Sequence, residues 1–281
     1  MDDGSAPAAG GYVLGSTDRE MARLAALSEV YGPVTAAWLD SAGLRPGATV
    51  VDVGCGPGDV SLAAAERVGP TGTVLGLDAA PRPLELARAR AAAAGLRNVS
   101  FEQADVTRWR PPAPVDAVVG RLILVHLPDP VAQVARLAGT VRPGGVVAFA
   151  DVALSTRAAQ PELPLLTAFN AWLLGTFTRS GRPVDMALRL TGVFRAAGLP
   201  DPVLTAAAPL ERGGDAVGWS VVAGDVAGLL PVMERTGVAT REEIGPETFE
   251  QRLRAQAAEH DAVLVNPLVV GAVARTPDGG G

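Results

Sequence analysis

Lysine is absent from this sequence of 281 residues, so all 24 basic side chains are arginine. A codon bias toward arginine explains that absence, and no function follows from it. The 30 acidic side chains outnumber the basic ones, which gives a formal net charge of −6. Proteins that bind nucleic acid present a basic surface to the phosphates, so nucleic acid is not the expected partner.

Cysteine occurs once, as Cys55, which excludes an internal disulfide and favours a reducing cytoplasm. No run of about 18 uncharged apolar residues is present, so no membrane span is expected. The first residues, MDDGSAPAAGGYVLG, lack the charged and apolar regions of a signal peptide. Together these absences predict a cytoplasmic protein that does not enter the membrane.

Hydrophobic residues make up 48% of the sequence, which favours a folded globule with one large domain or one domain and a cap. Short apolar runs alternate with helical patterns in the first half of the chain. This alternation predicts a parallel sheet with helices on both faces, whose strands all end at one edge. The expected strands are 48–53, 73–77, 98–105, 115–119 and 146–154, and the expected helices are 58–69, 82–95 and 129–141.

The pattern differs at both ends of this region. Residues 17–42 have helical spacing, and Gly32-Pro33 is expected to divide them into two helices. After Leu154, helices are expected from Pro164 to 180 and over 184–198. Residues 214–260 are expected to be mostly helical, with breaks at Pro231, Gly237 and Pro246, between strands at 202–209 and 267–275.

The segment VVDVGCGPGDV, residues 50–60, places three glycines directly behind an apolar run. A glycine loop between a strand and a helix lets backbone N–H groups and the helix N-terminus approach a ligand closely. The spacing is G-x-G-x-G and not the G-x-G-x-x-G of dinucleotide-binding proteins. Alone the loop is therefore a weak signal, and a loop that only turns tightly is the alternative.

Acidic residues end the next two expected strands. Asp78 stands where a carboxylate accepts hydrogen bonds from a ribose diol and disfavours a 2′-phosphate. Asp105 stands where it accepts from an adenine amine, and a helix N-cap is its alternative role. Three such features at successive strand ends predict a ligand that contains a nucleoside.

Five segments occur in the order VVDVGCGPGDV, GLD, EQAD, VDAVVGRLILVHLPDP and VRPGGVVAF. Together they resemble the class I S-adenosylmethionine-dependent methyltransferases, above all the small-molecule branch that methylates quinones and natural products. The resemblance covers roughly residues 10–200, and the strand at 267–274 is similar to the family's antiparallel seventh strand. The implied fold is a doubly wound α/β fold with a seven-stranded, mostly parallel sheet whose last strand is antiparallel, with N-terminal helices and helical cap insertions.

This resemblance also implies four regions along the chain. They are an N-terminal arm with helices (1–42), a Rossmann-like cofactor-binding core (43–154), a helical lid (155–183), and a C-terminal part of the core (184–281) with a helical insertion (210–260).

The cofactor implied by the resemblance is S-adenosylmethionine. The glycines would pack against its methionine part with Asp52 near the amino group, while Asp78 would hold the ribose. Tyr12 either closes over the cofactor or is a surface aromatic, and Arg121 either faces the crevice or forms a salt bridge. The implied cofactor-binding residues are Tyr12, Asp52, Gly54, Cys55, Gly56, Gly58, Asp78, Ala79, Asp105, Val106 and Arg121.

Methyl transfer from a sulfonium needs in-line approach more than it needs a reactive side chain. His126 is a candidate general base, because it follows the fourth strand and titrates near neutral pH. A histidine that packs against the start of the next helix is the alternative. Asp151 ends the fifth strand, where it either orients the acceptor or accepts hydrogen bonds from backbone amides. Asp129 could meet both in space, but no clear ligand cluster supports a metal site.

Apolar and aromatic residues over 160–180 predict either a helix that faces the core or a lid over the acceptor. In the lid interpretation Phe169, Asn170 and Trp172 contact the acceptor, and Trp219 of the insertion forms a second wall. Few charges lie in these segments, which predicts a hydrophobic small molecule as the acceptor.

The expected function is therefore methyl transfer to an oxygen or carbon atom of a hydrophobic small molecule, in natural-product biosynthesis. An NAD-dependent dehydrogenase is one alternative, disfavoured by the glycine spacing and by the lack of a second nucleotide-binding half. A protein of this fold that has lost methyl transfer, as a cyclase-type catalyst or a binding partner, is another. The acceptor and the oligomeric state stay open, and a homodimer is among the alternatives.

Overall fold

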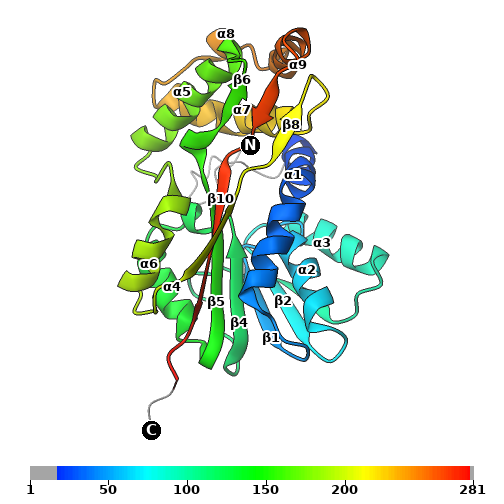
Figure 1. Cartoon of the computed structure of the whole chain (residues 1–281), viewed down its shortest axis with the longest axis vertical. Helices are drawn as coiled ribbons and strands as arrows, with labels where there is room; N and C mark the ends of the chain where they lie inside the picture. The colour runs from blue at the N-terminus through cyan, green and yellow to red at the C-terminus, as the bar shows by residue number, and fades with distance from the viewer. Residues whose placement is uncertain (1–17, 279–281) are drawn as a thin grey trace, which may run out of the picture.

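The computed structural model describes residues 18–278 (Figure 1). A central sheet flanked by helices forms one half of the molecule, and a mainly helical cap forms the other. The helices are α1 (Asp18–Ala42), α2 (Asp59–Val68), α3 (Pro81–Ala93), α4 (Pro130–Ala138), α5 (Pro164–Arg179), α6 (Leu190–Ala196), α7 (Gly218–Arg235), α8 (Arg241–Ile244) and α9 (Phe249–Glu259), with short 3-10 turns η1 (Leu124–His126), η2 (Leu154–Thr156) and η3 (Met186–Arg189). The strands are β1 (Thr49–Val53), β2 (Thr73–Asp78), β3 (Val99–Gln103), β4 (Val115–Arg121), β5 (Val141–Ala153), β6 (Ala158–Gln160), β7 (Val203–Ala207), β8 (Leu210–Arg212), β9 (Val263–Val265) and β10 (Leu268–Arg275).

The central sheet has seven strands in the order β3-β2-β1-β4-β5-β10-β7. Strands β1 to β5 pair in parallel, whereas β10 runs antiparallel to both of its neighbours, β5 and β7. This confirms the predicted doubly wound sheet with an antiparallel last strand. The parallel strands all end at the edge of the sheet that faces the cap.

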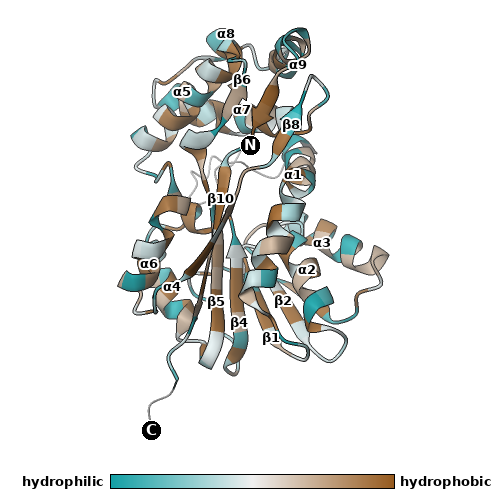
Figure 2. Ribbon diagram, in the orientation of Figure 1, coloured by the Kyte–Doolittle hydropathy of each residue, from teal (hydrophilic) through white to brown (hydrophobic). Residues whose placement is uncertain are grey.

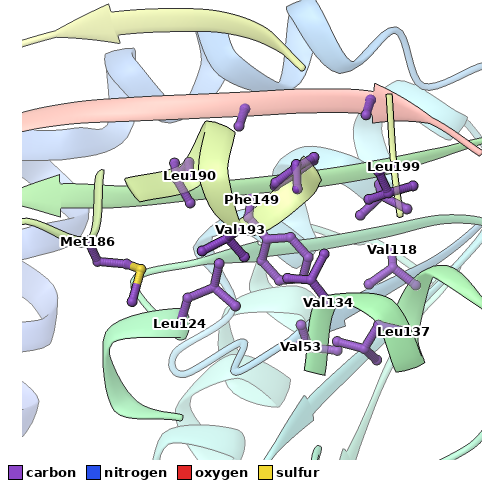
Figure 3. Packing of buried hydrophobic residues seen from close by; sticks show 14 of the residues in the cluster. Val53, Val118, Leu124, Val134, Leu137, Phe149, Met186, Leu190, Val193 and Leu199 are labelled. Atoms are coloured by element: carbon purple, nitrogen blue, oxygen red, sulfur yellow. The ribbon is translucent and has the colours of Figure 1, made fainter. Parts of the chain in front are cut away.

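Helices cover both faces of this sheet, so its central strands are mainly apolar, as is typical of parallel sheets (Figure 2). Alternate residues of β1 point to opposite faces. Val51 and Val53 belong to a cluster that includes α4 and α6, part of which is drawn in Figure 3. Val50 belongs to a second cluster, which includes α1 and α2. The sequence therefore specifies two hydrophobic layers.

A third hydrophobic cluster holds the cap together, with residues from α5, α7 and α9. A three-stranded antiparallel sheet in the order β6-β9-β8 accompanies these helices. Sequence reasoning missed this sheet, because each of its strands has only three residues and their pairing joins distant parts of the chain.

Two predicted helix breaks are wrong. Helix α1 continues through Gly32-Pro33, and α7 continues through Pro231. Both prolines are exposed, so each helix loses a backbone hydrogen bond on its solvent-facing side and not in the core. The predicted breaks at Gly237 and Pro246 are correct, since α7 ends at Arg235 and α8 at Ile244.

Trp38 anchors α1 on the sheet by packing against Gly271 of β10. The indole is fully buried, and a Cβ atom on residue 271 would overlap with its ring. The absence of a side chain at Gly271 is therefore what lets the longest helix lie close to the sheet.

We expect Gly271→Ala to lower the free energy of unfolding by about 1–3 kcal/mol, because the added methyl group overpacks the contact with Trp38. Denaturant unfolding measures this change. In a Trp38→Leu background the same substitution should cost clearly less. Gly192→Ala is the matched control, since a Cβ there meets nothing within 4 Å and α6 gains a better helix former. An equal loss in both backgrounds would contradict the proposed contact.

Candidate active site

A cavity of about 820 Å³ lies between the C-terminal edge of the central sheet and the cap. The glycine loop and the ends of β2 and β4 form one wall. Helices α1, α5 and α7 form the opposite wall. The cavity thus lies where parallel α/β sheets usually bind their ligands.

The glycine loop of residues 54–58 turns sharply below this cavity. Gly54 and Gly58 have φ values of 70° and 88°, which other residues rarely adopt. A Cβ at Gly54 would also lie only 2.6 Å from Ile123 Cδ1. Gly56 differs, because a Cβ there would meet nothing within 4 Å. The loop therefore presents a bare backbone to the cavity at Gly56, beside the buried Cys55, which also lines it.

Asp78 lines the cavity and also holds the loop in place. Its carboxylate accepts hydrogen bonds from the N–H of Gly56 and the N–H of Ala80, both at 2.9 Å. Burial raises the pKa of Asp78 despite these bonds. Ala79 lies beside it in the cavity wall. Asp78 thus combines the predicted ligand-facing position with a structural role that the sequence did not indicate.

Asp105 and Val106 also line the cavity, as the sequence predicted. The Asp105 carboxylate is exposed and accepts from the backbone N–H of Thr107 at 2.9 Å and from its hydroxyl at 2.6 Å. These bonds lower the pKa of Asp105. The hydrogen bond from the Thr107 N–H closes a turn. No helix begins at this turn, so Asp105 is not a helix N-cap, which was its alternative role.

Asp52 does not line the cavity, which corrects its predicted place at the ligand. It is fully buried beneath the loop, where it accepts a hydrogen bond of 2.6 Å from the Ser61 hydroxyl. Its other oxygen has no hydrogen-bond partner, and burial raises its pKa to about 7. Tyr12, also predicted to contact the cofactor, lies outside the described residues.

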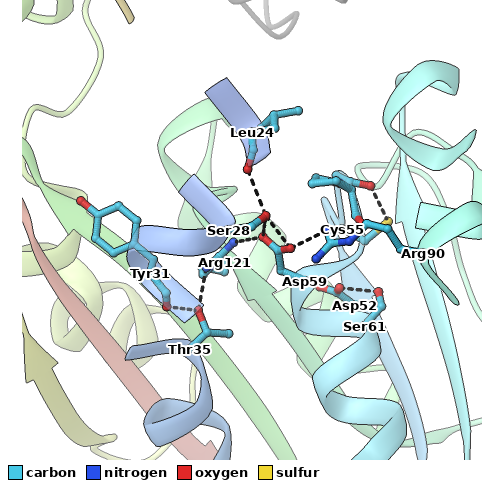
Figure 4. Close-up of polar contacts among 12 residues, drawn as sticks. Leu24, Ser28, Tyr31, Thr35, Asp52, Cys55, Asp59, Ser61, Arg90 and Arg121 are labelled. Carbon is cyan, nitrogen blue, oxygen red and sulfur yellow. Dashed lines mark hydrogen bonds and ion pairs between the residues drawn. The ribbon is translucent and has the colours of Figure 1, made fainter. Parts of the chain in front are cut away.

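Arg121 reaches the cavity wall but forms the salt bridge that was its alternative role (Figure 4). It donates to Asp59 at 2.7 Å and to Thr35 at 2.6 Å. Asp59 also accepts from Ser28 at 2.6 Å and from Arg90 at 2.6 Å. Burial alone would raise the pKa of Asp59, but Arg121, Ser28 and Arg90 together lower it.

Sequence reasoning missed Asp59, although it lines the cavity. The available signal was an acidic residue in the first turn of the helix that follows the glycine loop. A carboxylate at that position is stabilised by the helix N-terminus.

Asp151 is fully buried and does not line the cavity. It accepts from the N–H of Val125 at 3.3 Å and from the N–H of Val152 at 2.9 Å, and burial raises its pKa to about 7. This geometry favours the alternative role as an acceptor of backbone amides over direct contact with an acceptor molecule. Asp151 therefore fixes η1, the turn that carries His126.

His126 lines the cavity at the predicted edge of the sheet. Its Nδ1 atom lies 3.3 Å from Nη1 of Arg182. Burial, Arg182 and Arg23 lower the pKa of His126 to about 3, far from the neutral value expected from the sequence. The ring is therefore neutral near pH 7 and a weak proton acceptor, which argues against the predicted role as general base.

The four residues predicted to contact the acceptor do not line the cavity. Phe169 and Trp219 are fully buried in the cap cluster, where Trp219 Nε1 donates to the Gly213 carbonyl at 2.9 Å. Trp172 packs against the same cluster, and Asn170 Nδ2 donates to the Arg157 carbonyl at 3.0 Å. Helix α5 instead faces the cavity with its last turns, through Leu173, Thr176 and Phe177, and Ser180 follows at its C-cap. Spacing alone did not show which side of the helix the cap would cover.

A buried ion-pair network at the cap end of the cavity was also missed. Arg23 lies 2.7 Å from Glu20 and 3.2 Å from Asp225, and Arg157 lies 3.3 Å from Asp225. Arg23 and Asp225 are 202 positions apart, so no local pattern could have paired them. Two donor atoms of Arg157, Nε and Nη1, are buried without a hydrogen-bond partner.

Residues 18–278 contain no group of three or more His, Cys, Asp or Glu residues that could hold a metal ion. Within the same range, every helix is too short or too polar to cross a membrane.

The raised pKa values of Asp52 and Asp151, both about 7, predict a pH dependence of stability. The unfolded chain has ordinary aspartate pKa values near 3.9, so the folded state binds more protons between about pH 4 and pH 7. The free energy of unfolding should therefore fall as pH rises through this range, by up to about 1.4 kcal/mol per pH unit and group. Urea unfolding at several pH values measures the slope.

Asp151→Asn should reduce this slope, because one of the two groups is removed. Asp201→Asn should leave it unchanged, since Asp201 is exposed and its pKa is lowered by Arg195. A slope in Asp151→Asn equal to that of the wild type would show that Asp151 titrates normally.

Comparisons with known proteins agree with this geometry. Residues 44–175 match the model of a methyltransferase domain family. Aklanonic acid methyltransferase of Streptomyces sp. (strain C5) is 38% identical over 122 residues, which are 43% of this chain and 56% of that protein. Nocamycin O-methyltransferase of Saccharothrix syringae is 42% identical over 158 residues, 56% of this chain and 52% of that protein. The chain thus spans about half the length of these relatives.

A solved structure with a similar fold is that of the YcgJ protein from Bacillus subtilis, with a TM-score of 0.56 at 18% identity. The alignment covers 88% of this chain and 100% of that one. At such low identity the likeness concerns the fold alone. The assignment to a class of enzyme depends instead on the sequence relatives, which are methyltransferases. Residues 44–175 therefore form a methyltransferase domain.

Proposed function

We propose that this protein transfers a methyl group from S-adenosylmethionine to an oxygen or carbon atom of a hydrophobic small molecule. The observation that carries this proposal is the single continuous cavity of about 820 Å³. One end has the glycine loop, Asp78 and Asp105, and the other end has a mainly apolar wall from the cap beside the ion-paired Arg23, Arg157 and Asp225. The volume falls in the upper part of the range of about 300–1,000 Å³ that is typical of small-molecule sites.

The residues at the first end fit S-adenosylmethionine. The bare backbone at Gly56 would admit its methionine part, the Asp78 carboxylate would accept from the ribose hydroxyls, and Asp105 would accept from the adenine amine. When bound, S-adenosylmethionine supplies an electrophilic methyl group on a sulfonium. The protein's part is to hold donor and acceptor in line, which by itself accounts for much of the rate of such reactions.

The second end fits a hydrophobic acceptor. Its wall includes Leu173 and Phe177 of α5 and Val221, Leu229 and Val232 of α7. The names of the two relatives are those of natural-product methyltransferases, which supports an acceptor of that class here. Such a cavity suits a small molecule as the acceptor. The dehydrogenase and cyclase-type alternatives have less support, because the sequence relatives are methyltransferases.

We expect the protein to bind S-adenosylhomocysteine with micromolar affinity or better and NAD negligibly, as measured by titration calorimetry. Asp78→Asn should weaken S-adenosylhomocysteine binding about tenfold or more, because a charged acceptor of hydrogen bonds is lost. Asp116→Asn is the matched control. Asp116 also accepts from a backbone N–H, that of Thr49, but it does not line the cavity. Tighter binding of NAD would overturn the proposed function.

We also expect a panel of hydrophobic hydroxy and carboxy compounds to contain acceptors whose products are heavier by one CH₂ group. Mass spectrometry should find S-adenosylhomocysteine and the methylated product in equal amounts. Val232→Phe, which narrows the cap end, should reduce kcat/KM for the acceptor about tenfold or more and leave S-adenosylhomocysteine affinity nearly unchanged. Conversion of a panel compound without formation of S-adenosylhomocysteine would instead support the cyclase-type alternative.

A further inference from the structure

Leu122 has a backbone conformation that leucine rarely adopts. Its φ is 58°, and among residues 18–278 the only other non-glycine residue in this left-handed region is Asp261, with a φ of 47°. The Cβ atom crowds the backbone there, so this conformation is unfavourable for every residue except glycine. Because glycine would avoid the cost, the leucine side chain at this position needs an explanation.

The hydrophobic core does not supply this explanation. Leu122 is followed by Ile123, Leu124 and Val125, and all three belong to or pack against the cluster that includes α4 and α6. None of the three hydrophobic clusters of residues 18–278 includes Leu122. Leu122 instead lines the cavity and is partly exposed. The cavity is therefore where this side chain can find a partner that compensates for the strained backbone.

Leu122 lies where the central sheet divides. Strands β1 and β4 are neighbours, with Asp52 opposite Val119, but β1 continues to β2 on one side and β4 continues to β5 on the other. Parallel sheets bind their ligands at such a switch point. The residue after Leu122 packs on the glycine loop, because a Cβ at Gly54 would lie 2.6 Å from Ile123 Cδ1. The cofactor end of the cavity is thus on the β1 side of Leu122.

The cap end of the cavity begins on the β5 side of Leu122. The Leu122 N–H donates to the Ala150 carbonyl of β5 at 2.8 Å, and Val152 and Leu154 further along the chain line the cavity. Leu122 therefore lies between the glycine loop and the apolar residues that face the acceptor. Its side chain has no polar group, so it suits an apolar acceptor better than the charged sulfonium and methionine groups of S-adenosylmethionine.

Resting on the proposed function, we propose that Leu122 is a specificity-determining residue that packs against the apolar body of the acceptor, next to the atom that receives the methyl group. Methyl transfer depends on the alignment of donor and acceptor. A side chain held at this point excludes orientations of the acceptor in which another atom faces the sulfonium. The contact with the acceptor is what the strained backbone makes possible.

Thermal unfolding without ligands tests whether the leucine serves the fold. Leu122→Gly should have a melting temperature within about 2 °C of the wild type or above it, because relief of the backbone strain offsets the lost side chain. Asp261→Gly is the matched control, since it relieves the same conformation outside the cavity and removes only a surface ion pair. A fall of more than about 5 °C in Leu122→Gly alone would show that the leucine stabilises the fold and would overturn the inference.

Ligand binding tests the contact itself. The probes are 2-naphthol and 2-hydroxyanthraquinone, titrated into the S-adenosylhomocysteine complex of the full chain. Leu122→Gly and Leu122→Ala should each weaken the binding of both probes about tenfold or more, because both variants lose the apolar contact. The affinity for S-adenosylhomocysteine should change by less than about threefold in both variants. Asp261→Gly should leave all of these affinities unchanged.

The outcomes separate this inference from the proposed function. Weaker probe binding in Leu122→Gly but not in Leu122→Ala would assign the effect to the backbone. A loss of S-adenosylhomocysteine affinity with unchanged probe binding would assign Leu122 to the cofactor. Either result, or a wild-type complex that binds neither probe, overturns this inference alone. A wild-type protein that does not bind S-adenosylhomocysteine overturns the proposed function and this inference together.

Discussion

The carboxylate of Asp59 is the point on which the arrangement of the site depends. It receives hydrogen bonds from Ser28 of α1, Arg90 of α3 and Arg121 of β4, and it belongs to the first turn of α2. Four elements from separate parts of the chain therefore meet at one largely buried negative charge. Removal of the carboxylate would leave Arg121 without its counter-charge, and the loss of one partner of a buried pair typically costs about 3–5 kcal/mol. The glycine loop lies directly before Asp59, so its position follows from this cluster.

A second constraint joins the core to the cap. Helix α1 packs on the sheet through Trp38 and on α7 of the cap through the pair of Arg23 and Asp225. Because one continuous helix makes both contacts, the distance between the cofactor end and the cap end of the cavity is fixed. Gly224 of α7 supports this approach, since a Cβ there would overlap with the Arg23 side chain.

The polar groups of the site fall into two sets, buried residues and residues of the cavity wall. Asp52 and Asp151 are buried beneath the two segments that face the cavity, the glycine loop and η1. Asp78, Asp105 and His126 are in the cavity wall. Asp151 holds the backbone of η1, whereas Asp52 accepts from the Ser61 hydroxyl of α2. In methyl transfer this division is reasonable, because position and charge matter more than a reactive side chain.

The sequence by itself determined the core of the fold and one end of the site. Alternating apolar runs and helical patterns predicted the order of strands from 48–53 to 146–154, because a parallel sheet buried on both faces needs such strands. The glycine loop and the acids Asp78 and Asp105 predicted one end of the cavity, since chain connectivity alone brings the ends of parallel strands to one edge. These features are local or follow from a topological rule.

Only the tertiary structure decided what lies above that edge. Trp219 and Phe169 had the right composition for a pocket wall, but the cap buries them in its own core and turns Leu173 and Phe177 to the cavity. The low pKa of His126 arises from burial and from Arg182, 56 positions away, and the pairing of Arg23 with Asp225 spans 202 positions. Helix periodicity shows that a helix has an apolar side but does not show which neighbour covers it. The electrostatic environment of a side chain likewise depends on charges that only folding brings together.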